Sequence, residues 1–168
     1  MKKDCIALPG AFNGFVGRMV KEHGFQGGYI SGAALTACAG VPDIGVLTLD
    51  HFSRVIREVV NVSDLPLIVD ADTGFGEAEM VTRTVKEYHH SGAAGLHIED
   101  QEFPKRCGHL DGKNLISTQA MVDKIHRARD ASQACSNGEF IICARTDAAG
   151  VPAHGFDEAV ERAYLTHL

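Results

Sequence analysis

Short apolar runs alternate with longer helical patterns along the whole chain, and this alternation constrains the fold most. The apolar runs are continuous, and they cover residues 5–8, 28–31, 67–70, 95–98 and 140–144. Continuous apolar strands are typical of a parallel sheet that is covered on both faces. The sequence therefore predicts an α/β fold.

Amphipathic helical patterns fill the gaps between these runs. In residues 12–20, apolar side chains recur at the three- and four-residue spacing of one helix face, and Gly24 follows as a helix-ending residue. Similar patterns cover residues 52–60, 78–88, 121–128 and 156–163, with Ser117 as an expected N-cap. Five consecutive β–α units follow from this pattern.

Two architectures accommodate such units, a doubly wound open sheet and a (β/α)8 barrel. The first strand-to-helix turn, LPGAFNG at residues 8–14, lacks the GxGxxG spacing, and no GxxxxGK[ST] segment occurs. A complete barrel needs about 250 residues, whereas this chain has 168. If the fold is a barrel, residues 1–168 form a single partial barrel domain with about the first five units.

Composition excludes several classes of protein. The chain has 16 basic and 22 acidic residues and a net charge of −6, so we expect no nucleic-acid partner. No apolar run approaches about 18 residues, so we expect no membrane span. Five cysteines without a CxxC pair favour reduced thiols. The N-terminus carries no targeting signal, which predicts a cytoplasmic protein, although an incomplete N-terminus would leave an organellar location open.

Acidic residues gather where the predicted strands end. Asp70, Asp72 and Glu99 follow buried strands, and parallel strand ends converge on one edge of a sheet. Such acids repel one another unless a cation lies between them, and oxygen ligands without paired His or Cys favour Mg2+ or Mn2+. Asp43 either reaches this cluster from a loop or is a turn residue after Pro42.

Arg145, Cys107 and His97 are further candidates. Arg145 follows an apolar strand, so it either forms a structural salt bridge or grips a substrate carboxylate. Cys107 stands between Arg106 and His109 with Lys105 nearby, a setting that lowers a thiol pKa and suits acid or base chemistry. His97 either contacts substrate or is a core residue.

The segment KRCGH at residues 105–109 resembles a signature of the isocitrate lyase and phosphoenolpyruvate mutase superfamily. The resemblance extends to YISG at 29–32, LPLIVDADTGFG at 65–76, GAAGLHIEDQ at 92–101 and ARTDA at 144–148. Within that superfamily the segments are most similar to the branch that cleaves 2-methylisocitrate.

The resemblance implies a (β/α)8 barrel with Mg2+ at its C-terminal mouth, Mn2+ being an alternative. Asp70 would bind the metal directly, while Asp72, Asp43 and Glu99 would hold its water ligands. The implied substrate is a small carboxylate, and the residues that would bind it are Tyr29, Ser31, Gly32, His97, Gly108 and Arg145.

The implied reaction is the retro-aldol cleavage of 2-methylisocitrate into pyruvate and succinate. Cys107 would protonate the departing succinate carbanion, with His109 and Lys105 around it. Related lyases or hydrolases acting on 2,3-dimethylmalate, isocitrate or oxaloacetate are the alternatives. The intact CGH segment favours the lyases over phosphonate chemistry.

The sequence departs from the family pattern at two places. Ala33 and Ala34 stand where lyases often have more glycine, and the sequence stops at Leu168, before the family's later strands. A homo-oligomer is the implied state of the full-length form. An inactive truncated form that acts only by association is therefore a further alternative.

Overall fold

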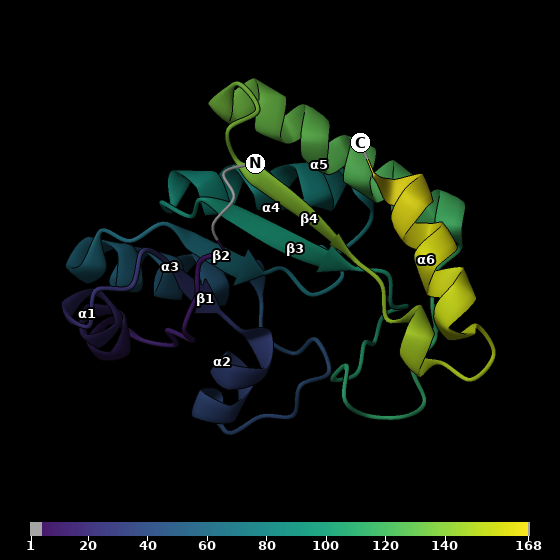
Figure 1. Cartoon of the computed structure of the whole chain (residues 1–168), viewed down its shortest axis with the longest axis horizontal. Helices are drawn as coiled ribbons and strands as arrows, with labels where there is room; N and C mark the ends of the chain where they lie inside the picture. The colour runs from purple at the N-terminus through teal and green to yellow at the C-terminus, as the bar shows by residue number, and fades with distance from the viewer. Residues whose placement is uncertain (1–4, 168) are drawn as a thin grey trace.

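A computed structural model describes residues 5–167, and its centre is a four-stranded parallel sheet (Figure 1). The strands are β1 (Gly28–Ile30), β2 (Leu67–Asp70), β3 (Gly95–Glu99) and β4 (Ile141–Arg145). Each strand pairs with the next one along the chain, in the order β1-β2-β3-β4. The predicted α/β fold with a parallel sheet is therefore confirmed, and it has the form of a partial barrel.

The predicted first strand at residues 5–8 is wrong. The chain instead meets β1 at a single parallel bridge between Gly10 and Tyr29. There the Tyr29 N–H donates to Pro9 O at 2.9 Å, and the Ala11 N–H donates to Tyr29 O at 2.7 Å. Because proline has no N–H to donate, pairing does not extend from this bridge toward residues 5–8.

Within residues 5–167, six α-helices and one 3-10 helix connect and cover the strands. The predicted N-cap is confirmed, since Ser117 Oγ accepts from the Ala120 N–H at 3.2 Å, and Gly24 follows the first helix at φ 78°. The elements are α1 (Gly14–Glu22), α2 (Gly32–Ala39), α3 (Leu49–Ser63), α4 (Ala78–His90), α5 (Thr118–Ser136), η1 (Ala148–Gly150) and α6 (Gly155–Thr166).

Helix α2 occupies a segment that the sequence pattern left as an Ala-rich loop containing Cys38. Ser31 caps this helix, with its Oγ accepting from the Ala34 N–H at 3.4 Å, and Gly40 ends it at φ 70°. Alanine has the highest helix propensity, which explains why a short run without an amphipathic stripe becomes helical. Cys135, also expected in a loop, lies in α5.

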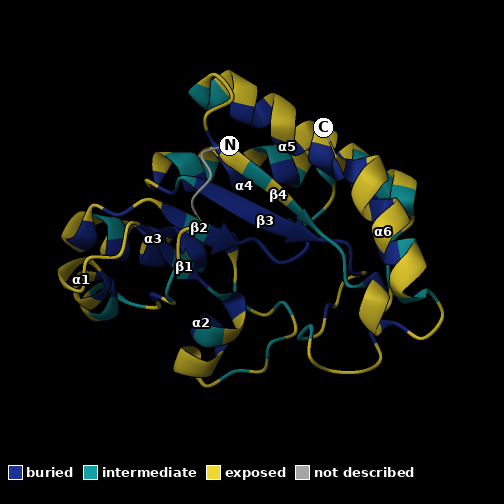
Figure 2. Cartoon of the chain, viewed as in Figure 1, coloured by how far each residue is buried: buried dark blue, intermediate teal, exposed yellow. Residues whose placement is uncertain are grey.

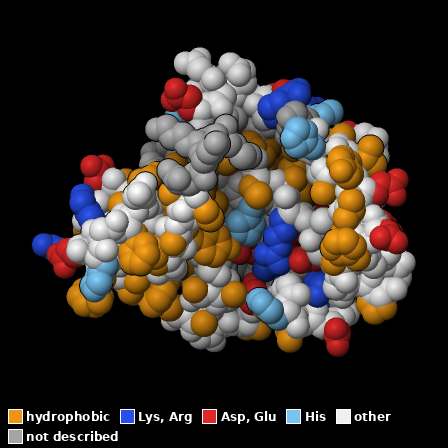
Figure 3. Space-filling model, in the orientation of Figure 1, with side chains coloured by type: hydrophobic (Ala, Val, Ile, Leu, Met, Phe, Trp, Pro, Cys, Tyr) orange, Lys and Arg blue, Asp and Glu red, His pale blue; other side chains and the backbone are white. Residues whose placement is uncertain are grey.

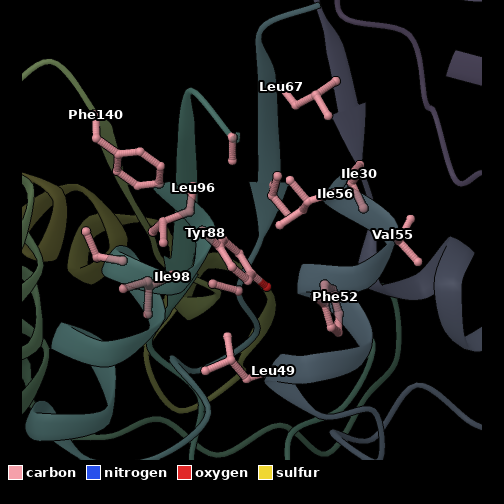
Figure 4. Packing of buried hydrophobic residues seen from close by; sticks show 14 of the residues in the cluster. Ile30, Leu49, Phe52, Val55, Ile56, Leu67, Tyr88, Leu96, Ile98 and Phe140 are labelled. Carbon is pink, nitrogen blue, oxygen red and sulfur yellow. The ribbon is translucent and has the colours of Figure 1, made fainter. Parts of the chain in front are cut away.

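Aromatic side chains connect α3 and α4 to the sheet (Figure 4). Phe52 of α3 and Tyr88 of α4 are fully buried, and their rings stack with centroids 6.4 Å apart. The Tyr88 hydroxyl donates to Asp70 O at 2.9 Å. This bond fixes the end of β2 against α4, so the core sets the position of the carboxylate that follows.

The outer edge of β4 has no partner strand among residues 5–167. Figure 2 shows β3 buried along its length while β4 is partly exposed, and Ile141 is 55% exposed. Phe156, which the helical pattern placed on the apolar stripe of α6, is 72% exposed. Within the described residues, no helix has the length and apolar character needed to cross a membrane.

Candidate functional site

Charged and histidine side chains gather at the carboxyl ends of the strands. Figure 3 shows basic, acidic and histidine groups together near the middle of the molecular face in view, with hydrophobic side chains on both sides of them. The site is built from strand ends and from the loops that follow them, as the α/β pattern predicted.

Asp70 lies at the end of β2 with both carboxylate oxygens in use. Its Oδ2 accepts from the Gly32 N–H at 3.0 Å, and its Oδ1 accepts from the Asp72 N–H at 3.0 Å. A Cβ at Gly32 would lie only 3.0 Å from Asp70 Oδ2, so any larger residue there would require the carboxylate to shift. Asp70 therefore joins the start of α2 to the loop after β2.

Lys105 lies at the centre of the other acids. Its ammonium nitrogen is 2.7 Å from Asp43 Oδ1, 2.8 Å from Asp72 Oδ1 and 3.8 Å from Glu99 Oε1. The Lys105 side chain is only 3% exposed. The structure thus brings Asp43 into the cluster, and Lys105 supplies a positive charge that the acids need.

Burial perturbs the charges of this cluster. It raises the pKa of Glu99 to about 8, although Lys105 and Arg145 act in the opposite direction. Burial also raises the pKa of Asp72 to about 6. Burial lowers the pKa of Lys105, but Asp72 and Glu99 outweigh this effect, so the net shift is upward and Lys105 stays charged. The cluster is therefore able to hold or release protons near neutral pH.

The oxygen atoms of the clustered carboxylates are ligands of the type that a hard divalent cation prefers. Asp43 Oδ1 and Asp72 Oδ1 are buried without a hydrogen bond that satisfies distance and angle together. Among residues 5–167, however, no three or more His, Cys, Asp or Glu side chains form a ready metal site. Lys105 holds the central position, so metal binding would require its ammonium to move.

Arg145 extends from the end of β4 beside this cluster. Its Nη1 is 3.4 Å from Glu99 Oε2, and its Nη2 donates to Asp147 Oδ1 at 3.0 Å. The side chain is 35% exposed, so the guanidinium is accessible from the open face. The two interpretations of Arg145, as a structural salt bridge and as a group that binds a substrate carboxylate, are compatible. The ion pairs with Glu99 and Asp147 hold the guanidinium in position, and a substrate carboxylate could replace them.

Tyr29 and His97 form a pair across β1 and β3. The Tyr29 hydroxyl oxygen is 2.8 Å from His97 Nε2, which is also 3.8 Å from Asp70 Oδ1. Burial raises the pKa of Tyr29 to about 12 and lowers the pKa of His97. The phenol therefore stays protonated beside a neutral imidazole, and the two groups share one hydrogen bond.

The segment 102–113 after β3 carries the thiol and is here called the Cys107 loop. Cys107 Sγ lies 3.8 Å from His109 Nδ1. The Arg106 guanidinium donates to Asp111 O at 3.3 Å. A Cβ at Gly108 would collide with Arg145 Nη2, which places the backbone next to Cys107 against the guanidinium.

Gln101 and Asp147 are parts of the site to which the sequence assigned no role. Gln101 Nε2 is 2.8 Å from Asp147 Oδ2 and 3.1 Å from Glu99 Oε1. Both residues follow the predicted strand ends by only three positions, and that proximity was the available signal.

Replacing Glu99 with glutamine is expected to remove a pH dependence of stability. A carboxyl whose pKa is higher in the folded chain stabilises the fold fully below its ordinary pKa of 4.5, and loses this contribution as pH rises through about 8. Thermal melts of the metal-free chain should therefore fall more steeply between pH 4.5 and 8 than those of Glu99→Gln. Glu139→Gln, at an exposed position, is the control, and parallel curves for all three chains would contradict the assignment.

Comparison with known proteins identifies the class to which this fold and site belong. Residues 1–165 match the family described as phosphoenolpyruvate phosphomutase. The chain is 50% identical over 156 residues to a probable 2-methylisocitrate lyase 1 of Corynebacterium glutamicum, covering 93% of this chain and 50% of that protein.

Two solved structures share the fold. An oxaloacetate acetylhydrolase in complex with 3,3-difluorooxalacetate has a TM-score of 0.91 at 37% identity, over 97% of this chain and 55% of that one. A phosphonopyruvate hydrolase in complex with oxalate and Mg2+ has a TM-score of 0.82 at 31% identity, over 95% of this chain and 53% of that one.

These matches show a partial barrel of the type found in these enzymes. The chain belongs to the phosphoenolpyruvate mutase/isocitrate lyase superfamily. It spans about half the length of the curated relatives that it matches.

Proposed function

We propose that this chain carries catalytic residues of a carbon–carbon lyase that cleaves 2-methylisocitrate into pyruvate and succinate. The observation that supports this most is the contact of Gly108 with the Arg145 guanidinium. It brings the residue after Cys107 against a cation of the type that binds carboxylates. The names of the relatives support the same reaction.

Substrate binding would use groups with free hydrogen-bonding capacity. Arg145 would exchange its contacts with Glu99 and Asp147 for a bidentate grip on the substrate carboxylate. Ser31 Oγ accepts from Ala34, so its hydroxyl proton remains available for a substrate oxygen. Tyr29 and His97 would line the adjacent wall.

The cleavage would then move one proton at each end of the breaking bond. The substrate hydroxyl loses its proton to a carboxylate of the cluster, the carbon–carbon bond breaks, and its electron pair goes to the succinate fragment. The Cys107 thiol gives its proton to that carbanion, and pyruvate leaves with the new carbonyl. The carboxylate that took the first proton then returns one to the thiolate.

A divalent cation is part of this proposal. Asp70, with Asp72, Asp43 and Glu99, would hold Mg2+, and Mn2+ would serve the same ligands. Bound there, the cation would supply positive charge against the oxygens on which negative charge develops. The phosphonopyruvate hydrolase structure with oxalate and Mg2+ supports a metal in this superfamily.

Proton NMR of the purified chain with Mg2+ and 2-methylisocitrate tests the proposal. Pyruvate and succinate should appear in equal amounts, and chelation with EDTA should stop the reaction. The same assay with 2,3-dimethylmalate, isocitrate and oxaloacetate tests the alternatives, because preferred turnover of one of these would reassign the substrate. Absence of turnover with all four would favour an inactive form that acts by association.

A further inference from the structure

Two buried side chains hold the Cys107 loop, one on each side of the thiol. Gln101, which is 1% exposed, pairs with the backbone of Arg106 in both directions. The Arg106 N–H donates to Gln101 Oε1 at 2.8 Å, and Gln101 Nε2 donates to Arg106 O at 2.8 Å. This two-way pairing fixes the peptide groups of the residue immediately before Cys107.

Lys113 holds the other side. Its ammonium donates to Gly108 O and to Leu110 O, both at 2.7 Å, and the residue is only 7% exposed. Within residues 5–167, no carboxylate lies within salt-bridge distance of Lys113. A buried ammonium without a carboxylate is costly, so these two carbonyl bonds must compensate its lost hydration.

Gln101 also connects the Cys107 loop to Arg145. Its Nε2 carries two protons but has three acceptors within reach: Arg106 O, Asp147 Oδ2 at 2.8 Å and Glu99 Oε1 at 3.1 Å. Asp147 and Glu99 are the same two acids that contact Arg145. The amide thus shares these two acids with the guanidinium, each side chain contacting a different oxygen of the same carboxylate.

We infer that Gln101 and Lys113 are positioning residues that clamp the Cys107 loop, and that Gln101 couples this clamp to Arg145. Neither side chain touches the thiol, so their effect passes through the backbone of Arg106 and Gly108. The inference rests on the proposed function for the role of Cys107, but the clamp itself is measurable without substrate.

The test uses the whole chain with Gln101→Leu and Lys113→Met, each against a matched surface variant. Gln119→Leu changes an exposed amide on α5, and Lys86→Met changes an exposed lysine on α4. Hydrogen exchange of the Arg106 amide and iodoacetamide labelling of each cysteine, resolved by mass spectrometry, are measured without metal or substrate.

In both clamp variants Cys107 should be alkylated at least threefold faster, while Cys135 and Cys143 keep their rates. The Arg106 amide should exchange at least tenfold faster in Gln101→Leu, and the surface variants should match the unchanged chain. An unchanged or lower rate at Cys107 would overturn the clamp. So would equal acceleration at Cys135, because general loosening of the fold would then explain the result.

If Gln101→Leu does not fold, Gln101→Glu replaces it. Glutamate keeps the acceptor for the Arg106 N–H but loses the donor to Arg106 O and Asp147, so faster alkylation of Cys107 is again expected and unchanged alkylation overturns the clamp. In a chain with lyase activity, kcat should fall at least tenfold while KM changes less than threefold. Loss of the labelling effect counts against the clamp, whereas absence of turnover in the unchanged chain counts only against the proposed function.

Discussion

Replacing Cys107 with serine is expected to lower the turnover of 2-methylisocitrate by about 10²- to 10⁴-fold, the range that a single positioned acid contributes. Serine keeps the size and place of the side chain, but its hydroxyl is a much weaker acid than a thiol. Because the proton is needed only in the chemical step, KM should change little. Steady-state kinetics of a form active toward 2-methylisocitrate measures both parameters.

The matched control is Cys5→Ser, an exposed cysteine in the segment before β1. It should leave kcat and KM unchanged. If Cys107→Ser retains at least half of the kcat, the proton comes from another group, and His109, whose Nδ1 lies 3.8 Å from the sulfur, becomes the first candidate.

The parallel sheet was predictable because its strands are short continuous apolar runs, and β2 and β3 are buried along most of their length. The run at residues 67–70 matches β2, and the run at 95–98 is extended by one residue to Glu99 in β3. Residues 5–8 are also mainly apolar, yet Pro9 restricts pairing to one bridge at Gly10. Composition reveals an apolar segment, whereas the number of ladder bonds depends on tertiary contacts.

Helix α2 shows the opposite error. Its sequence, GAALTACA, has no polar face, so hydrophobic periodicity does not predict it. Alanine propensity and the Ser31 cap favour the helix, and the burial of Leu35 and Thr36 packs it against the fold. A propensity argument applied to residues 32–39 would have found it.

The convergence of the candidate acids was predictable from topology, but the position of Lys105 was not. The sequence suggested that Lys105 would act on the thiol two residues later. The structure places its ammonium 2.7 Å from Asp43 and 2.8 Å from Asp72. A buried carboxylate is costly without a cationic partner, so the positions of the acids decide where a nearby loop lysine points. Those positions are known only from the folded structure.

Replacing Asp70 with asparagine is expected to abolish Mg2+ binding and Mg2+-dependent turnover. The change removes the charge of the proposed direct ligand while nearly preserving its shape. Isothermal titration with Mg2+ measures binding without any need for activity. Asp130→Asn, at an exposed position on α5, is the control and should bind as the unchanged chain does.

The Asp70→Asn substitution also changes the local hydrogen bonding, so stability must be measured together with Mg2+ binding. Both Asp70 oxygens accept backbone N–H groups, from Gly32 and Asp72, so an asparagine NH2 group must face one of these donors. One hydrogen bond is therefore lost, and a modest fall in melting temperature is expected.

Asp70→Glu separates these two effects. It keeps the charge but moves it by one methylene, so it should disturb the Gly32 contact while preserving measurable, weaker Mg2+ binding. If Asp70→Asn binds Mg2+ as tightly as the unchanged chain, Asp70 is not a direct ligand. If Asp70→Glu loses binding as completely as Asp70→Asn, this expectation is wrong, and the position of the carboxylate at the end of β2 matters as much as its charge.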